Sequence, residues 1–293
     1  MNEPSDSRVA GVARTVVALV VLLVFWGAIG YTLWPELMPG LLRAAQSVRG
    51  IGAQEVESLY FEVGNNSDAS DAQVRGVVRT LEADYEAILE FLGRAPGDPI
   101  PVLITNGAGP AMADGARLNV FYDNGVLNLD TAPFFLVFLS QGEEFGFEVD
   151  FFLEGGLAIY VTEEVGRAQG FTGQPADAWV KLLQQKGALL PLSEARKVQA
   201  PESEEGLFDF VRALIESGSF VRWLVESHGL ETVGELRDGL SLENVIDLSL
   251  AEAEVAWLES VASKELQPKP CELALSGGSF LRAFCEQLEK HEP

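Results

Sequence analysis

Five acidic residues lie within a short glycine-containing stretch near the middle of the chain: Glu143, Glu144, Glu148, Asp150 and Glu154. Paired carboxylates can act as acid and base on glycosides, and converging carboxylates can bind Ca²⁺ together with carbonyl oxygens. The spacing matches no calcium-binding loop. We therefore interpret this acidic cluster as a solvated loop, and an active hydrolase with a site built from it remains an alternative hypothesis.

Few residues are available for chemistry that depends on histidine. The chain contains only two histidines, His228 and His291. A zinc peptidase uses two histidines one helical turn apart in H-E-x-x-H, which places both imidazoles on one face, and these two are too distant in sequence to form that pair. A Ser-His-Asp triad would have to recruit one of them, and the sequence lacks a G-x-S-x-G elbow. We predict no catalytic residue, no bound metal and no cofactor.

The chain also contains two cysteines, Cys271 and Cys285. An exported domain would allow them to form a disulfide, whereas in a cytosolic domain they would be small buried hydrophobic residues. The sequence leaves both states open. It contains no C-x-x-C and no cysteine and histidine spacing of a structural zinc site.

The patterns around these residues predict strands first and helices afterwards. A strand is expected over 58–63, a helix that begins at a capping box formed by Ser70 and Gln73, and a second strand over 99–105. The turn Asp123-Asn124-Gly125 predicts a hairpin between strands 118–122 and 126–129, because Asn-Gly suits positive φ. After residue 130 the pattern is helical, so the predicted fold class is α+β.

Three blocks in the second half resemble the gluzincin metallopeptidases, especially the bacterial peptidase-MA-like group. Residues 151–160 resemble the W-L-x-E-G-x-A-x-Y block of that family. Residues 218–224, followed by His228 and Gly229, resemble its G-S-F-V-x-W-L…Y-G helix, and residues 250–257 resemble its closing L-x-E-x-E-x-x-W helix. The resemblance covers roughly residues 57–260. It implies a gluzincin-like (thermolysin-like) domain with a small N-terminal sheet and hairpin and a helical C-terminal half.

The chain departs from this family at the metal site. The segment 134–141, where the resemblance places H-E-x-x-H, contains no His, Cys or carboxylate. Glu154 matches the third zinc ligand of the family, but one carboxylate without its imidazole partners does not hold zinc. We infer a degenerate site with Glu154 as its remnant, and hence a pseudoenzyme.

The resemblance also suggests where a peptide would bind. In such peptidases the hairpin edge strand lines a cleft that takes an extended peptide by strand addition. The corresponding residues here form a predicted peptide-docking edge: Val120, Tyr122, Val126, Leu127 and Leu129.

A separate segment near the N-terminus predicts a membrane anchor. Residues 15–35 contain no charged residue and as a helix would cover roughly 30 Å, the thickness of a hydrocarbon core. The predicted anchor residues are Val16, Leu22, Phe25, Trp26, Tyr31 and Trp34. A buried core helix and a cleaved signal peptide are the alternatives, and an uncleaved anchor explains the uninterrupted length and the aromatic residues best.

The predicted organisation follows from this anchor. It comprises a short tail over 1–14, a transmembrane helix over 15–35, a connector with an interfacial helix or plain linker over 36–56, and an extramembrane domain over 57–293. The flanking arginines balance. The predicted orientation, with the N-terminus inside, therefore rests on the short tail and on the fact that such anchors commonly precede an exported C-terminal domain. The expectation is a single-pass protein of a bacterial inner membrane with a periplasmic domain.

The charge of the chain narrows the choice of partners. The formal net charge is −24, and residues 51–293 carry −25 because residues 1–50 contain four Arg and only three acidic residues. Nucleic acid is excluded as a partner, because a body this acidic repels phosphates. With 47% hydrophobic residues the chain is also far from the composition of disordered proteins.

These expectations combine into one leading hypothesis. The protein is expected to be a non-catalytic, membrane-anchored pseudo-peptidase that acts as an accessory or scaffold subunit of a larger membrane complex. That complex could be a respiratory, photosynthetic, transport or envelope complex. The expected partners are the membrane and integral-membrane subunits of that complex. The alternatives are the hydrolase described above and a peptide- or glycan-binding module of the cell envelope.

Overall fold

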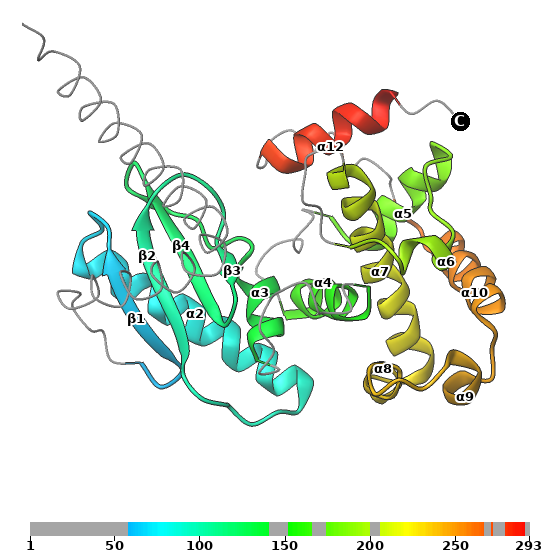
Figure 1. The fold of residues 1–293 in the computed structure, drawn as a ribbon, viewed down its shortest axis with the longest axis horizontal. Coiled ribbons are helices and arrows are strands. Elements are labelled where there is room, and N and C mark those ends of the chain that lie inside the picture. The colour runs from blue at the N-terminus through cyan, green and yellow to red at the C-terminus, as the bar shows by residue number, and fades with distance from the viewer. Residues whose placement is uncertain are drawn as a thin grey trace, which may run out of the picture. The chain divides into compact units, whose positions relative to one another are not determined.

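The computed structural model describes residues 58–140, 152–165, 174–199, 206–266, 271 and 279–290. Residues 54–293 form one compact unit, and its described part has an α+β fold in which a mixed sheet precedes a set of helices (Figure 1). The predicted fold class is therefore confirmed at that level.

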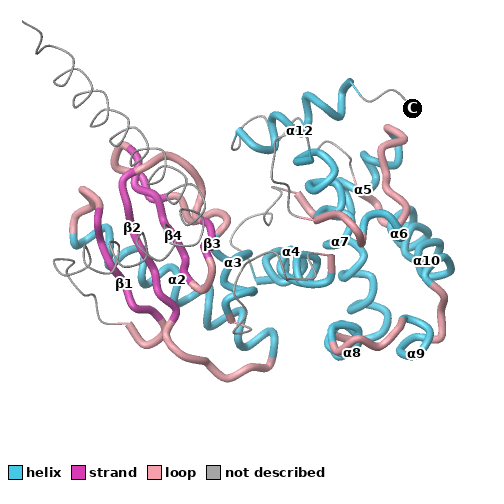
Figure 2. The backbone as a smooth tube through the Cα atoms, viewed as in Figure 1, coloured by secondary structure: helices cyan, strands magenta, loops and turns pink. Residues whose placement is uncertain are grey.

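The sheet contains the strands β1 (Phe61–Asn66), β2 (Ile100–Asn106), β3 (Met112–Asp114), β4 (Arg117–Asp123) and β5 (Val126–Leu127). Its order is β1-β2-β4-β3, with β5 also paired to β4. β1 and β2 run parallel, as do β2 and β4, whereas β3 and β5 run antiparallel to β4. Figure 2 shows these strands side by side.

The helix α2 (Asp71–Leu92) connects β1 to β2 and packs on one face of the sheet. Alternate residues of the strands, such as Val63, Val102 and Val120, are buried, while Glu62 and Pro101 between them are exposed. This alternation is expected where one face of a sheet meets a helix. The predicted capping box is present, because the Ser70 hydroxyl accepts from the backbone N–H of Gln73 and the Gln73 side chain accepts from the N–H of Ser70.

The predicted hairpin is also present. Tyr122 pairs with Leu127 and Asp123 with Val126 across a turn in which Asn124 and Gly125 both have positive φ, 49° and 89°. These angles fit the two-residue hairpin turn that Asn-Gly favours. The sequence patterns missed β3, because a strand of three residues leaves too short an alternation to recognise.

The helical half contains nine described helices: α3 (Ala132–Leu139), α4 (Leu153–Val165), α5 (Ala176–Gln185), α6 (Leu192–Ala195), α7 (Leu207–His228), α8 (Glu231–Arg237), α9 (Leu242–Ile246), α10 (Leu250–Ser263) and α12 (Ser279–Lys290). α3 packs against both α2 and α4, so it links the sheet layer to the helices. α4 in turn packs along α7, and α7 contacts α5, α6, α8 and α10.

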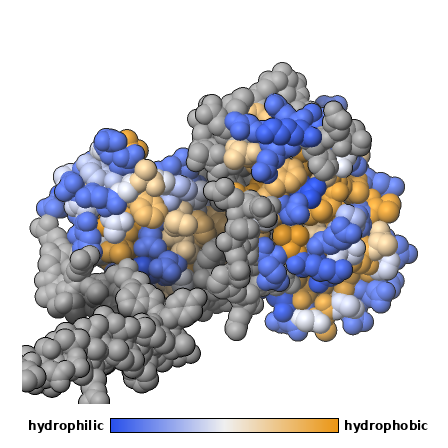
Figure 3. All heavy atoms as spheres, turned by 45° about the horizontal axis from the view of Figure 1, so that its top comes forward, coloured by the Kyte–Doolittle hydropathy of each residue, from blue (hydrophilic) through white to orange (hydrophobic). Residues whose placement is uncertain are grey.

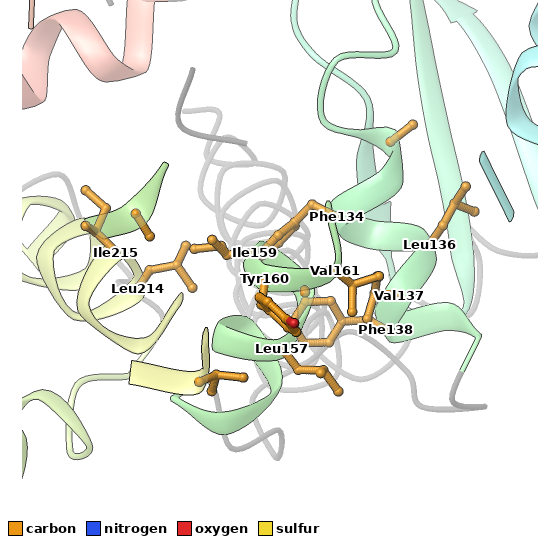
Figure 4. Packing of buried hydrophobic residues seen from close by; sticks show 14 of the residues in the cluster. Phe134, Leu136, Val137, Phe138, Leu157, Ile159, Tyr160, Val161, Leu214 and Ile215 are labelled. Atoms are coloured by element: carbon orange, nitrogen blue, oxygen red, sulfur yellow. The ribbon is translucent and has the colours of Figure 1, made fainter. Parts of the chain in front are cut away.

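The α4–α7 contact depends on glycine. A Cβ at Gly156 would lie 2.6 Å from the carbonyl oxygen of Ser217 and 2.6 Å from Cγ2 of Val221. At Gly218, in α7, a Cβ would collide with the side chain of Ile159 in α4. Both helices thus present a glycine to the other, which lets their backbones approach closely. Figure 4 shows side chains of α4 between those of α3 and of α7.

The two cysteines are joined in a disulfide, with their Cα atoms 5.7 Å apart. Of the two states that the sequence left open, the structure has the disulfide. In α12, Cys285 and Phe284 are both 3% exposed. The ring of Phe284 lies 5.8 Å from that of Trp179 in α5 and 5.1 Å from that of Phe208 in α7, so α12 belongs to the core of the helical half.

The predicted membrane anchor needs correction. In the part of the chain that the structure describes, no helix combines the length and apolar character needed to cross a membrane. The prediction of a single-pass, inner-membrane protein with a periplasmic domain is therefore not supported. The predicted tail, transmembrane helix and connector, residues 1–56 with all six anchor residues, lie outside the described residues.

Replacing Gly156 tests the role of the α4–α7 contact. We expect Gly156→Ala to lower the free energy of unfolding by about 2 kcal/mol, because the new methyl group meets backbone atoms that cannot move aside. Gly76→Ala in α2 is the matched control, since a Cβ there meets nothing within 4 Å. This control should raise stability by about 0.5–1 kcal/mol through helix propensity. Chemical denaturation measures both, and equal stability of the two variants would contradict the proposed contact.

Candidate functional site

Glu154, the residue that matches the third zinc ligand of the gluzincins, lies in the first turn of α4 with its side chain only 6% exposed. Its Oε1 forms an ion pair with Nε of Arg237, the last residue of α8, whose side chain is 19% exposed. A buried carboxylate needs a compensating charge or hydrogen bonds. Here a guanidinium from a neighbouring helix supplies that charge.

The helix α3 occupies the segment in which the resemblance places the zinc-binding histidines. Seven of its residues are buried, and all are apolar: Ala132, Pro133, Phe134, Leu136, Val137, Phe138 and Leu139. Figure 4 shows Phe134, Val137 and Phe138 close to side chains of α4. This surface of α3 therefore contributes hydrophobic packing and presents no metal ligand to α4.

The other candidate ligands are dispersed. Within the described ranges, no three His, Cys, Asp or Glu side chains gather closely enough to hold a metal ion. His228 ends α7, and its ring packs edge-on against Trp223 at 5.6 Å. His291 and the acidic residues Glu143, Glu144, Glu148 and Asp150 lie outside the described residues.

A buried polar network joins α5, α7 and α10. The indole Nε1 of Trp257 donates to Oγ of Ser219 at 2.9 Å, and that hydroxyl donates to Oδ1 of Asp177 at 2.5 Å. Asp177 also accepts from Nζ of Lys264 at 2.7 Å, and Lys264 donates to Glu226 at 2.9 Å. The first three side chains are at most 3% exposed, so the network fixes the relative positions of the three helices.

A second network joins α4 to α5 and α7. Glu163 in α4 accepts from Arg222 of α7 at 2.5 Å and from the backbone N–H of Ala176, in the first turn of α5, at 2.8 Å. Burial raises the pKa of Glu163 to about 7, while Arg222 and the Ala176 amide act in the opposite direction. The guanidinium of Arg222 also lies 5.4 Å from the centre of the Tyr160 ring. These contacts position helices, and their charges already have protein partners.

Glu216 in α7 is fully buried, at 0% exposure. Its Oε1 accepts from the backbone N–H of Leu190 at 2.9 Å, whereas its Oε2 has no hydrogen-bond partner among the described residues. Burial raises the pKa of Glu216 to about 8, although the Leu190 amide and the nearby Arg212 favour the ionised form; Glu254 disfavours it. The carboxyl group is therefore mostly protonated at neutral pH.

The predicted peptide-docking edge is only partly at an edge. β4 lies between β2 and the short strands β3 and β5. Val120 is 0% exposed and pairs with Ile104 of β2, and Tyr122 pairs with Leu127. Val126 is 64% exposed, while Leu127 and Leu129 are half-buried. The exposed apolar residue of the set is thus Val126 on β5, and peptide binding there stays a prediction.

Neither polar network is predicted by the sequence patterns. Their members are ordinary charged and hydroxyl residues on separate helices, and one sequence carries no signal that they meet. The one available hint was that Ser219 and Trp257 belong to two of the blocks that resemble gluzincins. Their hydrogen bond gives these blocks a structural role, because it fixes α7 against α10.

A scan against protein-family models finds no match, and comparisons with curated proteins and with solved structures find no similar protein either. The gluzincin resemblance therefore remains a prediction from sequence motifs, and the fold is described from the structure alone.

Breaking the Glu154–Arg237 pair should destabilise the protein. We expect Arg237→Met to lower the free energy of unfolding by about 3 kcal/mol, because it leaves a buried carboxylate without its counter-charge. The double variant Glu154→Gln/Arg237→Met should recover most of that loss, since it removes both charges. Denaturant unfolding of the two single variants, the double variant and the wild type completes the cycle, and additive effects would show that the pair is not coupled.

The buried carboxyl of Glu216 predicts a pH dependence. The folded protein keeps a proton on Glu216 up to about pH 8, whereas the unfolded chain releases it near 4.5. Between these values the folded state binds more protons, so its stability falls as the pH rises, by up to about 1.4 kcal/mol per pH unit. Glu216→Gln should remove this slope and become the more stable form at pH 8. A pH-independent difference between the two proteins would contradict the assignment.

Proposed function

We propose that this protein is a non-catalytic pseudo-peptidase, a gluzincin-like domain that serves as an accessory or scaffold subunit by binding another protein. The proposal combines the motif resemblance with the environment of the residue that would be the last trace of a metal site.

The ion pair between Glu154 and Arg237 is the observation on which the proposal depends. In the gluzincins the matching carboxylate faces a zinc ion, whereas here it faces a guanidinium. Arginine keeps its charge at every physiological pH. A metal ion at Glu154 would therefore have to displace a permanent cation from a carboxylate that is almost fully buried.

The apolar surface of α3 supports the same proposal. If α3 corresponds to the zinc helix, Phe134, Val137 and Phe138 stand where that helix would present imidazoles and a general base. Reversing this state would require several substitutions within a close-packed core. The α4–α7 crossing and the buried polar networks hold the helices together through contacts between groups of the protein itself.

The charge of the domain favours a protein partner. Residues 51–293 carry a net charge of −25, which attracts a basic protein surface and repels nucleic acid. A retained scaffold with a strongly charged surface is suited to docking, and its partner in this proposal is a protein with a basic contact region.

Metal and peptidase assays test the non-catalytic part of the proposal. We expect the full chain, equilibrated with Zn²⁺ and freed of excess ion, to hold much less than one zinc per molecule by mass spectrometry. A diverse peptide mixture incubated with it should remain uncleaved. The variants Glu154→Gln and Glu143→Gln/Glu144→Gln are the matched controls, and stoichiometric zinc lost in Glu154→Gln, or cleavage lost in either variant, would overturn the proposal.

The accessory role has its own test. Protein extracted under native conditions should elute in size-exclusion chromatography as a complex with a partner in fixed stoichiometry, and high salt should dissociate that complex if charge contributes. Elution as a lone monomer at every salt concentration would count against the role.

A further inference from the structure

An open cavity of about 410 Å³ lies among α4, α7, α8, α9 and α10. Seven of its eleven lining residues are apolar, among them the buried Phe152, Phe220 and Leu242 and the 48% exposed Leu240. Polar groups also contribute, from residues such as Arg196 and Glu243. Pockets that bind small ligands have volumes of about 300–1,000 Å³, so this cavity is large enough to take several side chains. We refer to it below as the α8–α9 groove.

Several apolar residues of the groove and of its neighbouring chain segments are only partly covered. Leu236 and Leu250 line the groove and are half-buried, and Ile246 and Leu248 nearby in the chain are half-buried as well. On the face shown in Figure 3, hydrophobic residues reach the surface of the helical half between hydrophilic ones. An open groove with a half-exposed leucine in its lining suits a side-chain-bearing segment better than a small enclosed ligand.

The chain segment that contains α8 and α9 carries an excess of negative charge. Residues 231–254 contain seven acidic residues and one basic residue, Arg237, whose guanidinium is paired with Glu154. Four of the acidic residues are exposed and have no ion pair among the contacts of the described residues: Glu235, Asp238, Glu243 and Asp247. Arg196, at the end of α6, is the one cation in the lining. Glu243 is the acidic residue of the lining itself; Glu235 and Asp238 are chain neighbours of the lining residues Leu236 and Gly239, and Asp247 follows α9 directly. We refer to these four carboxylates as the acidic rim.

We propose that the α8–α9 groove binds a basic amphipathic helical segment of a partner protein, with apolar side chains seated in the groove and Lys or Arg residues on the acidic rim. This inference rests on the proposed non-catalytic binding role and assigns that role a surface. Apolar anchors supply the affinity of such contacts, and complementary charge supplies the association rate and the choice of partner.

The segment that fits has a defined chemistry. Apolar residues spaced three and four apart would form one face of a helix, and cations would occupy its flanks. An acidic or purely polar segment would be excluded, because it would bring like charges together or leave the groove unfilled.

A synthetic peptide tests the assignment. The probe is a fluorescein-labelled helix of about 15 residues with Leu at helical spacing and Lys elsewhere, and the readout is fluorescence anisotropy with the full chain near physiological salt. Two control peptides replace Leu by Ala or Lys by Glu. We expect binding of the Leu/Lys peptide and loss of roughly tenfold or more in affinity for each control.

Matched protein variants separate the groove from the general negative charge. We expect Leu240→Ala to weaken peptide binding roughly tenfold, while Val126→Ala, an exposed apolar residue on β5, has no effect. The charge reversal Glu235→Lys/Glu243→Lys at the groove should weaken binding far more than Glu62→Lys/Glu90→Lys, which changes the net charge equally on exposed residues of the sheet half. Circular dichroism confirms that each variant is folded.

The outcomes distinguish this inference from the proposed function. Equal effects of the two charge reversals, or unchanged binding by Leu240→Ala, would overturn the groove assignment and leave the non-catalytic role standing. The dye anilinonaphthalene sulfonate provides a further control. If it binds in a Leu240-dependent manner while the peptide does not bind, the groove takes small apolar molecules and the assignment to a helical segment is overturned. Cleavage of the peptide would instead overturn the proposed function.

Discussion

The close crossing of α4 and α7 is the constraint on which the rest of the helical half depends. Gly156 and Gly218 remove the side chains that would hold the two helices apart. With the backbones this near, Glu163 of α4 reaches Arg222 of α7, and Leu157 to Val161 fill the space towards α3. Through α3 the same packing reaches α2 and the sheet. One helix contact therefore organises both layers, because close-packed interiors transmit the position of each element to the next.

Buried charges in this domain are compensated by other parts of the protein. Glu154 meets Arg237, Glu163 meets Arg222, and Asp177 meets Lys264. Each pair joins helices that are distant in sequence, so each helps to define which helices are neighbours, while its net contribution to stability is modest against the cost of removing two charges from water. The Glu154–Arg237 pair has the further consequence that the carboxylate most like a metal ligand is already engaged.

Local patterns in the sequence were sufficient for several elements. The Ser70–Gln73 capping box and the Asn124-Gly125 turn depend on residues within a few positions of each other, and both formed as expected. The burial alternation that marks β2 and β4 is equally local. The expectation was incomplete where a pattern was too short, as at β3. It was also incomplete at the docking edge, where Val120 was predicted to lie on an edge strand, whereas β3 and β5 pair with β4 and form that edge instead.

The sequence by itself determined the α+β class, the succession of a strand-containing half and a helical half, the excess of negative charge, and the lack of an H-E-x-x-H motif. Only the tertiary structure decided that Cys271 and Cys285 are bridged, that Arg237 faces Glu154, and that leucines of α8, α9 and α10 share one acidic-rimmed groove. The physical reason is sequence separation. A property set by neighbouring residues is encoded where they stand, whereas a contact between distant helices exists only once packing has brought them together.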